Sequence, residues 1–289
     1  LYSFSMMNNT LIIDAGSTKA DWIVIQDSST VIASIETEGL NALLINSEDL
    51  HSAVNRASSQ LGVDDIGRIY YYGAGCATPA ICNKVETVLT SVWNTERCEV
   101  NSDLLGAARA LLGDHKGVAC ILGTGSNSCL YDGKNISLQI PSLGFILGDE
   151  GGGAALGKRL LSDAFKEQLP ASIKEKFLDE YGLTLPEILD KVYKQPSPNR
   201  FLASFVPFLK DNLWNPYIYS LILRELTRFF KRNVAMYPGA HSLPVNFVGS
   251  IAFNFQTILK EAASSQGYSV NKVVRTPMEG LIEFHSTHI

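Results

Sequence analysis

Two short segments rich in glycine and hydroxyl side chains are the parts of this sequence best suited to chemistry. The first, Gly16-Ser17-Thr18-Lys19, follows an apolar stretch that ends at Asp14. The second, Gly123-Thr124-Gly125, follows the apolar stretch 118–122. Glycine lets the backbone approach a ligand closely, and successive N–H groups and hydroxyls in such loops bind anions. One loop in each half of the chain therefore predicts a polyphosphate held by both halves.

Three carboxylates stand beside glycines or at the end of an expected strand. Asp14 could hold Mg²⁺ directly or through water, although it could also be a plain strand-ending residue in a hairpin turn. Asp103 lies between an expected strand and a helix of small residues. It could accept a proton from a substrate hydroxyl, or it could cap the helix. Asp149, in a glycine-rich segment, could accept sugar hydroxyls or complement the helix dipole.

A third glycine junction comes later, where the apolar stretch 245–248 is followed by Gly249 and Ser250 and then by a helical pattern. A glycine here leaves room for a flat ring over the backbone, but such turns are common in α/β proteins. The sequence lacks the P-loop motif GxxxxGK[ST] and the HRD and DFG motifs of protein kinases. These two nucleotide-binding classes are therefore excluded.

The elements that must position these residues alternate between strands and helices. Each half opens with strand, glycine loop, strand and a further strand, which indicates a weak internal duplication in arrangement rather than identity. This order predicts an α/β fold with a mixed sheet in each of two domains, 1–114 and 115–289, around a deep cleft. A single helix is predicted over 251–264. The last helix, which begins near Gly280, is expected to pack back on the N-terminal domain.

Composition narrows the class of protein and of partner. The chain has 289 residues and a net charge of −5, without a basic stripe, so a nucleic-acid partner is not expected. Five cysteines without paired spacing favour buried thiols in a reducing cytoplasm, and the histidines show no metal spacing. His285 and His288 are expected at a frayed end. No apolar run spans a membrane, and Leu1–Ser5 do not read as a secretory signal, so a start at Met6 or Met7 is expected.

The combination of Leu122–Asn127, the Gly148-Asp149-Glu150-Gly151 box and Asp103 resembles the N-acetylglucosamine kinase-like branch of the BadF/BadG/BcrA/BcrD ATPase family. That family belongs to the actin-like (ribonuclease H-like) ATPase and sugar kinase superfamily. The resemblance implies ATP and Mg²⁺ as cofactors, a sugar substrate, a homodimer and a cytoplasmic enzyme.

The resemblance also implies a role for each matching residue. Asp103 is implied as the catalytic base, and Asp14 as the Mg²⁺ contact through water. ATP contacts are implied at Asp14, Gly16, Ser17, Thr18, Lys19, Thr124, Gly125, Gly249 and Ser250. Sugar contacts are implied at Asn41, Asp103, Ser126, Asn127, Gly144 and Asp149.

The predicted activity is phosphorylation of an amino sugar by ATP, with the 6-hydroxyl of N-acetylglucosamine as the first choice. Glucosamine or another hexosamine is an alternative acceptor. A regulator that senses sugar or ATP without turnover is a second class, although a pure binder would not require a base at Asp103. The family's other branch, iron–sulfur activators of acyl-CoA dehydratases, ranks below these because their second loop is of the DIGGQD type, whereas here it is GTGSN.

Overall fold

Two five-stranded mixed sheets organise the chain in the computed structural model, which describes residues 9–27 and 29–288. The proposed start at Met6 or Met7 lies outside these residues. The described part divides into two compact units. The first comprises residues up to Asp114, Gly133–Asn135 and the segment from Pro277 onward, and the second comprises His115–Asp132 and Ile136–Thr276. The α/β class with two mixed sheets is confirmed.

The sheet of the first unit has the strand order β3-β2-β1-β4-β5. Its middle strand, β1, pairs antiparallel with β2 and parallel with β4, and β4 pairs parallel with β5. Because Ala15 pairs with Gly73 and Gly73 with Ser102, the three parallel strands end at the same edge. The strands are β1 (Thr10–Ala15), β2 (Lys19–Gln26), β3 (Thr30–Glu38), β4 (Arg68–Gly73) and β5 (Cys98–Ser102).

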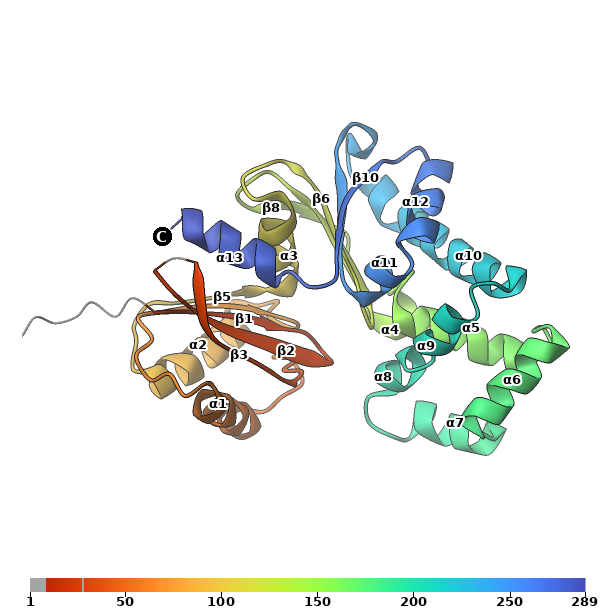
Figure 1. Cartoon of the computed structure of the whole chain (residues 1–289), viewed down its shortest axis with the longest axis horizontal. Coiled ribbons are helices and arrows are strands. Elements are labelled where there is room, and N and C mark those ends of the chain that lie inside the picture. The colour runs from red at the N-terminus through yellow and green to blue at the C-terminus, as the bar shows by residue number, and fades with distance from the viewer. Residues whose placement is uncertain (1–8, 28, 289) are drawn as a thin grey trace, which may run out of the picture. The chain divides into compact units, whose positions relative to one another are not determined.

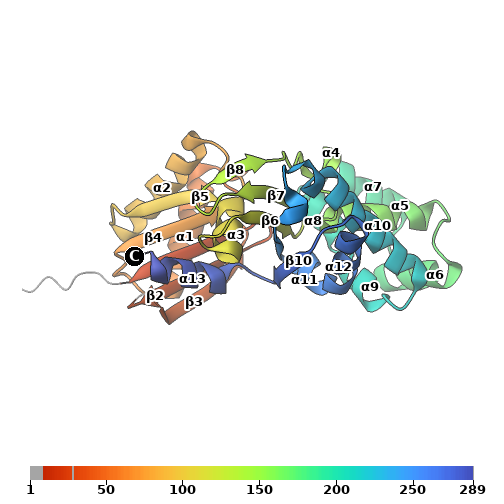
Figure 2. The ribbon, with the colours of Figure 1, turned by 90° about the horizontal axis from the view of Figure 1, so that it is seen from above.

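Helices cover both faces of this sheet (Figure 1). They are α1 (Ser47–Leu61), α2 (Pro79–Trp93), α3 (Asp103–Leu112) and α13 (Met278–Thr287). The helices α1 and α2 bury one face around Trp22, whereas α3 and α13 cover the other around Tyr72 (Figure 2). A Cβ at Gly280 of α13 would lie 2.2 Å from the carbonyl oxygen of Ala110, so only glycine permits this approach of the two helices.

The C-terminal helix is therefore anchored within the first unit. His285 is 2% exposed, stacks on Tyr70 with ring centroids 3.6 Å apart, and shares a 2.9 Å hydrogen bond with the hydroxyl of Tyr72. Burial lowers the pKa of His285 to about 3, and the guanidinium of Arg109 acts in the same direction. The prediction of a frayed end was wrong for His285, because its ring fills a space over β4 that the local sequence does not reveal.

The second unit repeats the topology of the first. Its sheet has the order β10-β9-β6-β7-β8, in which β6 pairs antiparallel with β7 and parallel with β9. Each strand of the first sheet thus has a counterpart, β1 with β6 and β4 with β9, and the predicted duplication of arrangement is confirmed. The strands are β6 (Gly117–Leu122), β7 (Ser126–Tyr131), β8 (Ile136–Gln139), β9 (Val245–Val248) and β10 (Val270–Val274).

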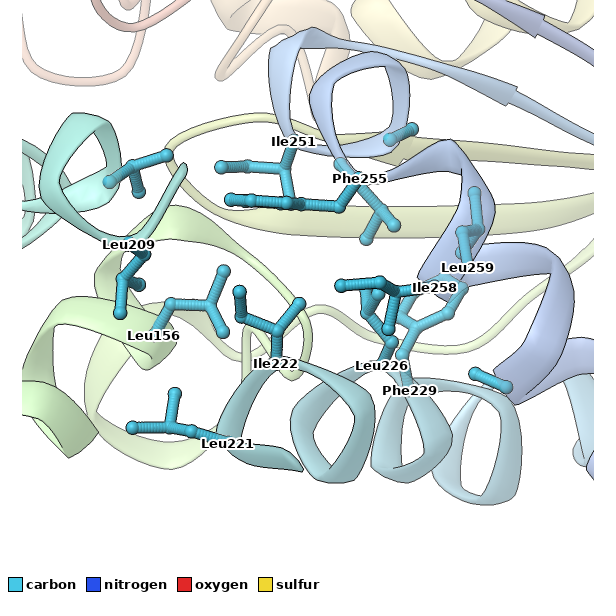
Figure 3. Packing of buried hydrophobic residues seen from close by; sticks show 14 of the residues in the cluster. Leu156, Leu209, Leu221, Ile222, Leu226, Phe229, Ile251, Phe255, Ile258 and Leu259 are labelled. Carbon is cyan, nitrogen blue, oxygen red and sulfur yellow. The ribbon is translucent and has the colours of Figure 1, made fainter. Parts of the chain in front are cut away.

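Helices between β8 and β10 supply the larger core. The α-helices are α4 (Gly144–Leu147), α5 (Gly153–Phe165), α6 (Ala171–Tyr181), α7 (Leu185–Tyr193), α8 (Pro198–Ala203), α9 (Val206–Asp211), α10 (Pro216–Arg232), α11 (Ser250–Asn254) and α12 (Gln256–Ser265), and two 3₁₀ turns follow α10 at Val234–Met236 and Ala240–Ser242. Figure 3 shows Leu156 of α5, Leu226 of α10 and Ile258 of α12 among the side chains that fill this core. Burial of such side chains is the main favourable contribution to folding.

One predicted helix is in fact two. The pattern over 251–264 suggested a continuous helix, but Phe255 departs from helical geometry with φ −111° and ψ 26° and separates α11 from α12. Its ring is 1% exposed, so the break accompanies burial of a large aromatic side chain. Within the described residues, no helix has both the length and the apolarity needed to cross a membrane.

Candidate functional site

The first glycine loop connects β1 to β2 and is held from outside by the segment that follows β3. The N–H of Gly39 donates to the carbonyl of Thr18 at 3.0 Å. A Cβ at Gly39 would lie 2.5 Å from the carbonyl carbon of Ser17, so the two backbones touch. The amide of Asn41 donates to the hydroxyl of Ser17 at 3.2 Å. The structure therefore brings Asn41, an implied sugar contact, to the first loop.

Asp14 and Asp103 lie at the shared edge of the parallel strands, on β1 and at the start of α3. Burial, reinforced by the charges of Asp103 and Asp21, raises the pKa of Asp14 to about 7. Burial also raises the pKa of Asp103, although its oxygen accepts the N–H of Leu104 at 2.8 Å. The two carboxylates interact electrostatically, which is the arrangement from which acid–base or cation-dependent chemistry is built.

The neighbouring residue Ser102 bears on the interpretation of Asp103 as a helix cap. Ser102 is the N-cap of α3, and its hydroxyl accepts the N–H of Leu105 at 3.3 Å. Ser102 therefore fills the N-cap position, and Asp103, in the first turn, accepts the N–H of Leu104 in addition.

The side chain of Lys19 pairs with carboxylates on β2 and β3. Its ammonium lies 3.0 Å from Asp21 and 2.8 Å from Glu36, and its side chain is 45% exposed. These ion pairs raise its pKa although partial burial opposes them. Exposed pairs of this kind contribute little stability, so they leave the ammonium available to an anion that competes for it.

The second glycine loop connects β6 to β7 and is docked on the start of α5 through the backbone. The N–H of Gly153 donates to the carbonyl of Gly123 at 2.8 Å, and the N–H of Ala154 to that of Thr124 at 2.9 Å. A Cβ at Gly152 would lie 2.7 Å from the carbonyl carbon of Gly125. Gly152, which directly follows the box, is therefore required for contact between two backbones, which is a structural reason for this glycine in addition to any ligand.

Asp149 is held between that loop and the box. Its backbone is left-handed, with φ +57°, and one carboxylate oxygen accepts the N–H of Ser126 at 3.2 Å. A Cβ at Gly125 would lie 2.6 Å from the other oxygen. Burial raises the pKa of Asp149, and the N–H of Ser126 opposes that rise. This carboxylate is thus in contact with the loop itself.

Glu150 links the Gly148–Gly151 box to α10. It is 6% exposed and accepts a hydrogen bond from the Nε of Arg232, on α10, at 2.5 Å. The sequence alone does not indicate this pair, because 82 residues separate its members.

Two further residues with an implied sugar contact, Asn127 and Gly144, lie in different parts of the second unit. Asn127, on β7, is engaged by its neighbours, since its side-chain oxygen accepts from the N–H of Ser128 and from Gln139. Gly144 opens the short helix α4 with φ +70° and is exposed. Its carbonyl accepts the N–H of Gly148 at 2.8 Å, which closes the segment just before Asp149.

Gly249 and Ser250 lie at the edge where β6 and β9 end together, because Ile121 pairs with Val248. Gly249 has φ +122°, and a Cβ there would lie 2.3 Å from the carbonyl oxygen of Leu122. Glycine is needed at this junction for its conformation and for contact with β6. Room for a flat ring is therefore not required to explain it.

The sequence interpretation missed two glycines that shape the first-unit site. Gly39 carries the backbone contact with Ser17 described above, and Gly75 has φ +83° with its missing Cβ 2.4 Å from the side-chain oxygen of Asn41. The signal was present in the sequence, since Gly39 directly follows β3 and Gly75 lies two positions beyond the end of β4, but the partner that each approaches is distant along the chain.

Comparison with known families identifies the chain. The profile of the BadF/BadG/BcrA/BcrD ATPase family matches residues 13–210. This protein is a member of that family. No curated protein sequence matches the chain.

Among solved structures, a candidate N-acetylglucosamine kinase from Porphyromonas gingivalis is 42% identical, with a TM-score of 0.93 over 97% of this chain and 100% of that one. A candidate N-acetylglucosamine kinase from Chromobacterium violaceum is 16% identical, with a TM-score of 0.74 over 96% and 99% of the two chains. A ROK family glucokinase from Streptomyces griseus, solved with glucose and AMPPNP, is 12% identical, with a TM-score of 0.57 over 96% and 98%. The last two likenesses establish the fold alone.

Proposed function

We propose that this ATPase-family member is a sugar kinase that transfers the γ-phosphoryl group of ATP to an amino sugar, with the 6-hydroxyl of N-acetylglucosamine as the acceptor. The observation that carries the proposal is the placement of Asp103 and Asp14 at one sheet edge beside the loop Gly16–Lys19. The 42% identity to the candidate kinase from Porphyromonas gingivalis supports the choice of acceptor.

Asp103 is proposed to orient the acceptor hydroxyl and to take its proton. A raised pKa suits that task, because a base whose pKa approaches the working pH accepts a proton more readily. Asn41 and Asp149 are proposed to bind other hydroxyls of the sugar. Phosphoryl transfer depends chiefly on positioning and electrostatics, so these contacts contribute by fixing the acceptor.

Asp14 fits the Mg²⁺ that such transfer uses. Its carboxylate supplies the hard oxygen ligand that Mg²⁺ prefers, and the neighbouring charges of Asp103 and Asp21 leave an excess of negative charge for a cation to offset. Among the described residues, no cluster of three metal-binding side chains occurs, which suits an ion held largely by water and phosphate. Bound Mg²⁺ would neutralise charge developing on the phosphates.

The loop Gly123–Gly125 and residues Gly249 and Ser250 are proposed to hold the nucleotide. The buried free thiols Cys120 and Cys129 agree with a reducing, cytoplasmic setting, which we include in the proposal together with a homodimer.

The test is ATP turnover with Mg²⁺ across a panel of sugars, with wild type compared against Asp103→Asn. Loss of the base is expected to lower kcat by about 10²–10⁴-fold with a small change in KM for the sugar. Glu48→Gln, at an exposed position of α1, is the matched control and should retain full turnover. Turnover with glucosamine alone would retain the mechanism and change the acceptor, whereas bound ATP without sugar-dependent turnover would favour the regulator.

A further inference from the structure

Asp149 contacts the loop implied to bind ATP phosphates, although the resemblance places it only among the sugar contacts. Its Oδ1 accepts the N–H of Ser126, and its Oδ2 lies 2.6 Å from the position that a Cβ at Gly125 would take. The side chain thus connects the loop between β6 and β7 to the segment that precedes α5. A sugar contact alone would not need this geometry.

The backbone of Asp149 is also held in an uncommon conformation. A non-glycine residue at φ +57° costs free energy, and the conformation persists only where the surroundings impose it. Here the N–H of Asp149 donates to Ser142 at 3.3 Å and its carbonyl accepts from Gly152 at 3.0 Å. Such strain persists where it aims a side chain, and this one is aimed at the loop.

The box that carries Asp149 is fastened on both sides. Glu150 pairs with Arg232 on α10, and a Cβ at Gly151 would lie 3.1 Å from Phe229 on the same helix. On the loop side, Gly153 and Ala154 bond to Gly123 and Thr124. The carboxylate of Asp149 is therefore presented from a rigid support rather than from a mobile segment.

We propose that Asp149 is a positioning residue for the second phosphate loop, so that one of its oxygens orders the loop for ATP while the other receives the sugar. This inference rests on the proposed kinase function. A hydroxyl donated to Oδ2 stabilises the ionised carboxylate, which is the stronger acceptor for the N–H of Ser126. Sugar binding should therefore tighten nucleotide binding, and by reciprocity nucleotide should tighten sugar binding.

Two substitutions separate the two roles. Asp149→Asn keeps an oxygen that can accept from Ser126, and asparagine tolerates the left-handed backbone. Asp149→Gly removes the acceptor and also tolerates positive φ. Glu167→Gly is the matched control, because Glu167 is an exposed acidic residue at φ +57° outside the box.

The experiment measures binding of a non-hydrolysable ATP analogue with Mg²⁺ by titration calorimetry, first without sugar and then with saturating N-acetylglucosamine. Asp149→Gly should weaken binding of the analogue without sugar about tenfold, the usual effect of losing one charge-assisted hydrogen bond. Asp149→Asn should stay within about threefold of wild type without sugar, yet lose the gain that sugar produces in wild type. Glu167→Gly should match wild type in both titrations.

Unchanged binding of the analogue by a folded Asp149→Gly variant would overturn the inference and leave the kinase proposal intact. Failure of wild type to bind the analogue at all would overturn both. Circular dichroism verifies folding of each variant, and if the glycine variant does not fold, the loss of the sugar-dependent gain in Asp149→Asn remains the deciding measurement.

Discussion

Asp14→Asn should stabilise the first unit at alkaline pH while abolishing the proposed kinase activity. The carboxyl of Asp14 lies among buried strands and near Asp103, and its pKa is raised from 3.8 to about 7. In the unfolded chain the same group ionises near its ordinary value. Asparagine has nearly the same shape and carries no charge, so the variant removes the ionisation from the folded state.

The sign follows from proton linkage. Between pH 4 and pH 7 the folded protein keeps a proton on Asp14 that the unfolded chain has lost, so this group lowers stability as pH rises. Below about pH 3 both states are protonated and wild type and variant should be alike, and at pH 4 the difference should still be below about 1 kcal/mol. At pH 8 the full difference applies, and the shift in pKa corresponds to a gain of about 2–4 kcal/mol for the variant.

Urea unfolding at pH 4, 6 and 8, followed by tryptophan fluorescence, measures this gain. Trp22 and Trp93 in the first unit are 0% and 3% exposed, whereas Trp214 in the second is 69% exposed, so the signal reports chiefly on the first unit. Asp64→Asn, at an exposed position of the same unit, is the control and should follow wild type at each pH, because it retains Asp14. Millimolar Mg²⁺ should stabilise wild type at pH 8 and leave Asp14→Asn unchanged. An Asp14→Asn variant that is no more stable than wild type at pH 8 would refute the reasoning.

Two further predictions concern packing and the C-terminal helix. Gly157→Ala should destabilise the second unit by about 3 kcal/mol despite the better helix propensity of alanine, because the added Cβ would lie 1.8 Å from the carbonyl oxygen of Leu202. The control Gly182→Ala, at φ +59° with open space around it, should cost about 1 kcal/mol. Equal urea midpoints for the two variants would contradict this ranking. His285 stays neutral in the folded state down to about pH 3, so its contribution to stability is complete above pH 6.5 and is lost as pH falls toward 3. His285→Phe should therefore lose less stability than wild type between pH 6.5 and 4 in urea titrations, and parallel losses would show that His285 does not carry this dependence.

Local chemistry in the sequence was enough to predict much of the framework. The alternation of strands with helices and the two glycine loops predicted a duplicated α/β fold, because turn residues and apolar periodicity act over a few residues. Asp14, Asp103 and the loop Gly123–Gly125 could be singled out as candidates for the same reason, since Asp14 lies near the end of β1 and the other two directly follow β5 and β6. The break at Phe255 was not predictable, because a helical pattern contains no signal for a ring that must be buried elsewhere.

Only the tertiary structure decided which residues distant in sequence come into contact. The raised pKa of Asp14 depends on Asp103, which 89 positions separate from it, and the burial of His285 depends on Tyr70 and Tyr72. The contact of Asp149 with the loop between β6 and β7 likewise appears only when the start of α5 docks on that loop. Residue types specify which groups can ionise, bend or donate, whereas their burial and their partners arise from packing, and these determine the chemistry of the site.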